Sequence, residues 1–260
     1  MLTELRHRDP LLFWIGAAML LVLVVVTLLS IGDTRLIAGL NPWIKPMKFL
    51  ISVTIFMWTV AWFMPETAGP RDGAFGVSQI DNRQIVRWTI GPVMIVEIAL
   101  ILLQAARGTT SHFNEQTLFD QVIFGIMAFG VFLSNLATLL LLTMIRRDAP
   151  SHRAAYLWGI RLGLTIFLLA GIEGSVMILN NAHTIGAPDG GPGLPFVNWS
   201  TRFGDLRVAH FFGMHAMQIL PLIGFLTRSR NLVVAASIAW VAPMGGLLAI
   251  ALQGRPLLAL

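Results

Sequence analysis

Seven long apolar stretches, separated by polar breaks, constrain the fold of this chain more than any other feature. Each stretch reaches the roughly 20 residues that an α-helix needs to cross the hydrocarbon core of a bilayer. The stretches lie at about 11–31, 43–64, 86–106, 118–145, 155–181, 206–227 and 232–253. The sequence therefore predicts an all-α fold, in which residues 1–260 form a single transmembrane domain, a polytopic bundle of about seven helices.

The composition agrees with a membrane protein. Charged residues make up 12% of the chain, whereas soluble domains carry about twice that share. The net charge of +5 does not indicate nucleic-acid binding, because the basic residues flank the apolar stretches. The absence of cysteine excludes disulfides, thiolate metal ligands and cysteine nucleophiles.

The basic residues are unevenly divided between the two ends of the predicted bundle. One end, formed by the N-terminus and the loops after spans two, four and six, holds Arg6, Arg8, Arg71, Arg83, Arg87, Arg146, Arg147, Arg153, Arg228 and Arg230. The other end holds Arg35, Lys45, Lys48, Arg107, Arg202, Arg207 and Arg255. Because cytoplasmic loops are enriched in Lys and Arg, we expect the N-terminus in the cytoplasm and the C-terminus outside.

This orientation places four of the six histidines on the outer side. His112 lies between spans three and four, His183 follows span five, and His210 and His215 lie near the start of span six. Histidine is a common ligand of transition metals and of haem iron. We predict that these histidines, with Asp205 as a further candidate ligand, bind a metal ion or a haem.

Polar residues also form stripes within the spans, where an unpaired charge costs several kcal/mol. Lys45, Lys48 and Ser52 are spaced three and four residues apart, which places them on one helix face. Glu97 lies near the middle of span three, and Glu173 lies in span five. We predict that such stripes line a polar cavity open to the outside, with Glu97 and Glu173 as candidate acid and base groups.

A metal in this cavity would be zinc or copper. A catalytic zinc needs three protein ligands and a fourth position for water. The outer histidines, together with Glu173 or Asp205, would supply the ligands, and Glu97 would act as general base. Such an enzyme would process a lipid-derived substrate that reaches the site from the membrane.

A haem b is the second cofactor that these residues suggest. Gly171, Gly174 and Gly213 would leave room for the ring between two helices. Arg202 and Arg207 would bind its propionates, because arginine suits carboxylates, and Lys48 is a further basic group of the cofactor site. A bound haem would make this protein a redox enzyme of the membrane.

A third interpretation requires no metal. A cavity that holds Lys48, Glu97 and Glu173 could carry protons or bind an anionic solute, as in a transporter or channel. The chain could also be a structural subunit of a larger membrane complex, or form a homo-oligomer. The sequence leaves these alternatives open.

Residues 186–195, GAPDGGPGLP, form a glycine- and proline-rich segment between spans five and six. Glycine and proline break helices and favour turns. We therefore expect an irregular loop over the outer end of the bundle. Loops of this kind often carry function, and this one could act as a lid over the predicted cavity.

Three sequence blocks carry a resemblance to known proteins. They are NPWIKPMKF (41–49), RGTTSHFN (107–114) and DGGPGLPFVNWS with GDLRVAHFFGMHAMQ (189–218). They resemble blocks of an uncharacterised family of bacterial multi-pass membrane proteins, which implies a location in the bacterial inner membrane and no established activity. More loosely, the chain resembles the zinc-dependent intramembrane hydrolases related to ceramidases, which show an H-x-x-x-H pair in the last span. Here His210 and His215 are five residues apart and lie in the sixth span.

Overall fold

The computed structural model describes residues 1–68, 81–147 and 150–259. Within these residues, seven helical segments are long and apolar enough to cross a membrane: Pro10–Gly32, Ile44–Glu66, Asn82–Arg107, Leu118–Met144, Arg153–Asn180, Leu206–Thr227 and Arg230–Leu252. The predicted all-α, seven-span bundle is therefore confirmed, and the chain is an integral membrane protein that crosses the bilayer several times.

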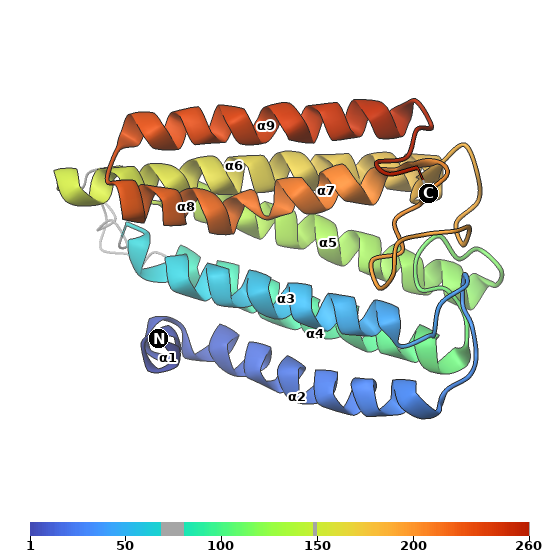
Figure 1. Cartoon of the computed structure of the whole chain (residues 1–260). Coiled ribbons are helices and arrows are strands. Elements are labelled where there is room, and N and C mark those ends of the chain that lie inside the picture. The colour runs from blue at the N-terminus through green and yellow to red at the C-terminus, as the bar shows by residue number, and fades with distance from the viewer. Residues whose placement is uncertain (69–80, 148–149, 260) are drawn as a thin grey trace.

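Figure 1 shows the long helices side by side in one bundle, with the two termini at opposite ends. The helices are α1 (Leu2–Arg8), α2 (Pro10–Gly32), α3 (Ile44–Phe63), α4 (Asn82–Arg107), α5 (Leu118–Met144), α6 (Ser151–Asn180), α7 (Leu206–Met214), α8 (Ala216–Thr227) and α9 (Arg230–Leu252). A 3-10 turn, η1 (Met64–Glu66), follows α3. The predicted placement of the termini at opposite ends is confirmed, whereas the side that faces the cytoplasm stays a prediction.

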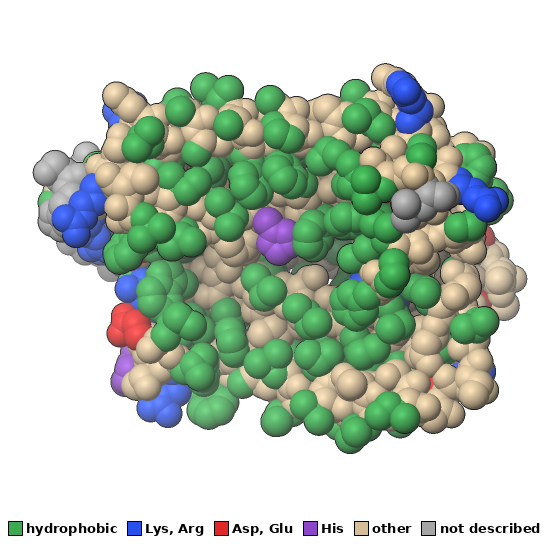
Figure 2. Space-filling view, in the orientation of Figure 1, with side chains coloured by type: hydrophobic (Ala, Val, Ile, Leu, Met, Phe, Trp, Pro, Cys, Tyr) green, Lys and Arg blue, Asp and Glu red, His purple; other side chains and the backbone are tan. Residues whose placement is uncertain are grey.

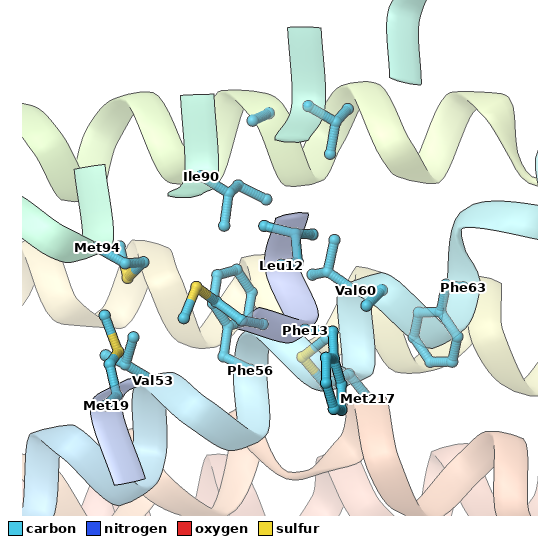
Figure 3. Packing of buried hydrophobic residues seen from close by; sticks show 14 of the residues in the cluster. Leu12, Phe13, Met19, Val53, Phe56, Val60, Phe63, Ile90, Met94 and Met217 are labelled. Atoms are coloured by element: carbon cyan, nitrogen blue, oxygen red, sulfur yellow. The ribbon is translucent and has the colours of Figure 1, made fainter. Parts of the chain in front are cut away.

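The helices form two groups that meet through large side chains. Helix α3 contacts α2 and α4, while α7 and α8 contact α6 and α9. Figure 3 shows Leu12, Ile90 and Met217, from both groups, buried in one core. The rings of Phe56 in α3 and Phe167 in α6 stack across the junction with centroids 5.3 Å apart. Since lipid tails are as apolar as these side chains, close packing rather than exclusion of water stabilises such contacts.

Glycines allow α6 and α8 to approach each other closely. A Cβ atom added at Gly159 would lie 2.4 Å from the carbonyl oxygen of Leu220, and one added at Gly163 would lie 2.8 Å from that of Ala216. Small residues four positions apart commonly create such contacts between membrane helices. The sequence of α6 therefore fixes the position of α8.

The sixth span is interrupted at His215, where α7 ends and α8 begins. The sequence analysis treated 206–227 as one continuous helix and did not predict this break. Pro221 lies inside α8 and lacks the N–H group that would bond to the carbonyl of Met217 in the first turn. The loss of this bond weakens the helix near His215 and favours the break there. Gly163 of α6 contacts the backbone of the same segment, at Ala216 and Met217.

Four non-helical segments, at 33–43, 108–117, 181–205 and 253–259, lie at one end of the bundle, which we call the loop end (Figure 1). The predicted irregular segment 186–195 is part of this end. Strands β1 (Thr184–Ile185) and β2 (Gly204–Asp205) pair antiparallel and close the longest of these loops. The loop is therefore held at its base, and its action as a lid stays a prediction.

Buried ion pairs fasten the opposite end. Glu66 is buried, with Arg8 at 3.4 Å and Arg153 at 2.6 Å from its carboxylate oxygens. Asp9 is also buried, 3.2 Å from Arg87. The sequence analysis assigned these arginines only to membrane-flanking loops and did not predict their pairing. Arg71, which it counted at the same end, lies outside the described residues.

Candidate functional site

Eight polar side chains come together at the loop end from α3, α4, α7 and two loops. We call this group the loop-end cluster; it consists of Lys45, Lys48, Glu97, His112, His183, Asp189, Asp205 and Arg207. The structure thus brings together six of the ten predicted site residues at the predicted place: Lys48, Glu97, His112, His183, Asp205 and Arg207, the last predicted as a propionate ligand.

The first turns of α3 carry two lysines, which are the only lysines in the sequence. The ammonium of Lys48 donates to the backbone carbonyl of Val197, at 3.1 Å, in the loop before α7. The half-buried Lys45 has neither a hydrogen-bond acceptor nor an ion-pair partner among the described residues; its ammonium lies 5.9 Å from the ring centroid of Phe49. Lys45 is therefore a cation of the cluster without an acceptor.

Glu97 and His112 face each other below the loop. The Nε2 atom of His112 lies 3.7 Å from Oε1 of Glu97, and this buried oxygen has no hydrogen-bond partner. The Nδ1 atom of His112 lies 3.0 Å from the Ser111 hydroxyl. Burial, assisted by the positive charge of Lys45, holds the pKa of His112 well below its ordinary value. The imidazole is therefore neutral at pH 7, and its contact with Glu97 is not a salt bridge.

Phe113 separates the two histidines of the cluster. Its ring centroid lies 6.2 Å from that of His112 and 4.9 Å from that of His183. The backbone of Phe113 has a φ of 54°, which is unusual for a bulky residue and stores strain. Strain of this kind persists only where the surroundings hold it, and the two imidazole rings are among the contacts that hold Phe113.

His183 is held by Asp189, which the sequence analysis did not single out. The Nδ1 atom of His183 lies 2.5 Å from the carboxylate, which also accepts the backbone N–H groups of His183 and Thr184. Burial lowers the pKa of His183 to about 4, although the bond to Asp189 opposes this shift. Burial disfavours the charge of Asp189, but its hydrogen bonds outweigh burial and hold its pKa below the ordinary value. At neutral pH, Nδ1–H donates to the carboxylate and Nε2 remains an acceptor.

Asp205 and Arg207 neutralise each other. Arg207 donates from Nε to Oδ1 at 2.9 Å and from Nη2 to Oδ2 at 2.5 Å, the bidentate geometry that arginine and carboxylate prefer. Asp205 also accepts the backbone N–H of Arg207, which caps α7, and that of Ser200. Both carboxylate oxygens of Asp205, a predicted metal ligand, are thus occupied. Arg202, predicted to bind propionates, is exposed on the loop.

The other two predicted ligands, His210 and His215, lie apart from each other. The Nδ1 atom of His210 lies 2.7 Å from the carbonyl oxygen of Ala170, and the ring of His215 packs edge-on against Phe211, with centroids 4.4 Å apart. The part of the chain that the structure describes holds no group of three or more His, Cys, Asp or Glu side chains that could bind a metal ion. The predicted shared ligand set is therefore not assembled there.

Glu173 is likewise separate from the loop-end cluster. Its side chain is buried, and neither carboxylate oxygen has a hydrogen-bond partner. It lies three residues after Ala170 and four before Met177, whose side chains pack against α7 and α9. The two predicted acid and base groups, Glu97 and Glu173, thus belong to different helix interfaces.

Comparison of the chain with family models, with curated proteins and with solved structures finds no match. Membership of the bacterial family that the sequence blocks resemble stays a prediction. The residues of the loop-end cluster are therefore the basis on which a function is inferred.

Proposed function

We propose that the protein binds a small anion in the loop-end cluster, with Lys45 as the cation that holds it. One observation carries this proposal: Lys45 has no acceptor, whereas its neighbours Lys48 and Arg207 each have one. The acidic side chains nearest in charge to it, Glu97 and Asp189, accept no hydrogen bond from it. An anion would supply the missing oxygen atoms, which is a common reason for ionisable groups within membrane spans.

The surroundings of Lys45 suit such a ligand. His112 and His183 are both neutral at pH 7, so Lys45, Lys48 and Arg207 supply the positive charge that faces an anion. The Nε2 atom of His183 is an acceptor for a hydroxyl group or water that accompanies the anion. The function that follows is recognition of a carboxylate- or phosphate-bearing solute, as in a transporter or a membrane receptor.

The test uses purified protein in nanodiscs of neutral lipid, with hexanoate, phosphate and sulfate as probes. A ligand that binds only the folded state raises the thermal midpoint as its concentration rises. We expect at least one anion to do so, with at least tenfold weaker binding to Lys45→Met and retained binding to Lys45→Arg. Arg255→Met, which removes an exposed charge at the same end, is the matched control. No response to any anion, or an unchanged response in Lys45→Met, overturns the proposal.

Metal or haem binding is a second candidate, favoured by one observation on His210. Its Nδ1–H group donates to the Ala170 carbonyl, which leaves Nε2 free, and histidines that ligate metals are commonly oriented in this way. Stoichiometric zinc, copper or haem in the purified protein, lost in His210→Ala, would support this function. Absence of all three from the purified protein excludes it. An orientation with the loop end outside the bacterial inner membrane belongs to both proposals.

A further inference from the structure

One face of α3 forms hydrogen bonds at two levels with the part of the chain that contains α7 and α8. We call these two hydrogen bonds ties. Lys48, Ser52 and Thr59 lie on this face, four and seven residues apart. Lys48 donates to the Val197 carbonyl at 3.1 Å, and the Thr59 hydroxyl accepts Nε2 of Gln218, in α8, at 3.2 Å. The two ties are separated by roughly 16 Å of helix at 1.5 Å per residue. Between them, Ser52 is exposed.

Helix α7 lies in the chain between the two partners of this face, Val197 and Gln218. Phe211, whose side chain is 46% exposed, packs edge-on against His215 four residues later. Figure 2 shows a hollow in the same face of the molecule between α7–α8 and α3, with histidine at its edge and basic side-chain surface in its depth. We call this hollow the α3–α7 slot. The contacts at Lys48 and Thr59 and the packing of Phe211 on His215 lead us to assign Ser52, Phe211 and His215 to its walls.

The slot differs in polarity along its length. Its end nearest the loops carries the two lysines, whereas farther along α3 the neighbouring Ile51 and Ile55 are exposed. Phe56, which stacks on Phe167, precedes Thr59 by three residues, so α3 contacts both α6 and α8 at this level. Because it runs between two membrane helices, the slot opens sideways toward lipid.

We propose that the anion bound by the loop-end cluster is a long-chain monocarboxylate, which enters from the bilayer through the α3–α7 slot. This inference rests on the proposed function and adds the class of ligand to it. The carboxylate lies against Lys45, and the single alkyl chain lies between α3 and Phe211. The charged end of the ligand thus meets a basic side chain, and its apolar end meets apolar side chains.

The charges of the cluster favour a monoanion. The cluster holds three basic side chains and three acidic ones, Glu97, Asp189 and Asp205, so a phosphate dianion would bring twice the negative charge of a monoanion into a partly buried site. The two ties, at Lys48 and Thr59, limit the length of the slot and favour one chain rather than two. These features distinguish a fatty-acid-like ligand from a phospholipid.

The experiment uses the full chain in phosphatidylcholine nanodiscs and an amine-specific acylating reagent. Because the sequence holds only two lysines, mass spectrometry reports acylation of Lys45 and Lys48 separately. The competitors are palmitate, hexanoate and hexadecanol, which has the chain without the charge. We expect palmitate to protect Lys45 at concentrations at least tenfold lower than hexanoate, and hexadecanol not to protect it.

Ser52→Phe fills the slot without changing the lysines. It should abolish the advantage of palmitate and leave protection by hexanoate unchanged, which also shows that the cluster still folds. Ala239→Phe, at an exposed position of α9, is the control and should behave as wild type. Equal protection by palmitate and hexanoate, unaffected by Ser52→Phe, would show that no alkyl chain binds in the slot. It would overturn the further inference and still support the binding of an anion to Lys45. Protection by neither carboxylate overturns the slot inference, whereas a thermal response to phosphate or sulfate would still support the proposed function.

Discussion

His183 and Asp189 form a short contact across a six-residue turn, with Nδ1 of the imidazole 2.5 Å from the carboxylate. The pair fastens the loop over the cluster because Asp189 also accepts the Thr184 backbone N–H at 3.0 Å. A fall in pH should destabilise this closed form of the loop. The pKa of His183 is about 4 in the closed loop and about 6.5 when exposed. The open loop therefore binds more protons between these values, and the stability of the closed loop falls as pH falls from about 6.5 to 4.

Hydrogen exchange of the Thr184 amide, corrected for its intrinsic rate, measures this effect. We expect less protection at pH 5 than at pH 7. His183→Asn retains an N–H donor for Asp189 and does not titrate, so it should reduce the pH dependence of this protection. The pKa of His112 is lowered too, and its protonation accounts for the pH dependence that remains in the variant. Protection that stays constant or increases toward pH 5 in wild type would contradict the assignment.

Glu66 should be important for stability at the opposite end. Its side chain is 4% exposed and lies between Arg8 and Arg153. Glu66→Gln removes the counter-charge of Arg153 and the buried one of the two acidic partners of Arg8, and should cost on the order of 3 kcal/mol. Glu4→Gln removes a largely exposed partner of Arg8 and should cost about 0.5 kcal/mol or less. Equal thermal midpoints of the two variants in detergent would show that Glu66 is not a structural partner.

The contact between α6 and α8 predicts a difference between two glycines. In Gly159→Ala the new methyl group meets the Leu220 backbone, so the helices must separate, at a cost of about 1–3 kcal/mol. In Gly246→Ala it meets open space, and the better helix propensity of alanine should leave stability unchanged or raised. The thermal midpoints of both variants provide the measurement. If both glycines tolerate alanine equally, the close approach of α6 and α8 is wrong.

The orientation in the membrane can be tested with single cysteines, because the chain has none of its own. Gly191 is exposed at the loop end, and an added Cβ there meets no other atom within 4 Å. Glu4 is exposed at the other end. A membrane-impermeant maleimide added to intact cells should label Gly191→Cys and not Glu4→Cys. The reverse pattern would place the loop end in the cytoplasm.

Hydropathy was sufficient to predict the spans of this protein. The predicted span 118–145 corresponds to α5 (Leu118–Met144), and 232–253 corresponds to α9 (Arg230–Leu252). Whether a segment can span the bilayer as a helix depends on its own length and apolar content, so its prediction needs no knowledge of tertiary contacts. The break at His215 was missed although Pro221 signalled it, because a proline in a membrane helix can also be accommodated without a break.

The pairing of polar groups could be predicted only in part. Counting basic residues and placing histidines identified the loop end, where His112 and His183 do lie close to Lys45. The partner of Lys48 is a carbonyl 149 residues away, and no helix periodicity contains that information. The predicted orientation also placed His210 with the others, but a bond to the Ala170 carbonyl holds it in a different helix interface.

The two lysines permit a direct test of the central claim, that Lys45 binds an anion. Protein labelled with ¹⁵N at lysine Nζ gives signals from Lys45 and Lys48 alone, which Lys48→Arg assigns. On titration with hexanoate in nanodiscs, we predict a saturable shift of the Lys45 signal and a smaller shift of the Lys48 signal, whose ammonium already has the Val197 carbonyl. A Lys45 signal that does not move at saturating hexanoate, phosphate or sulfate would contradict the account.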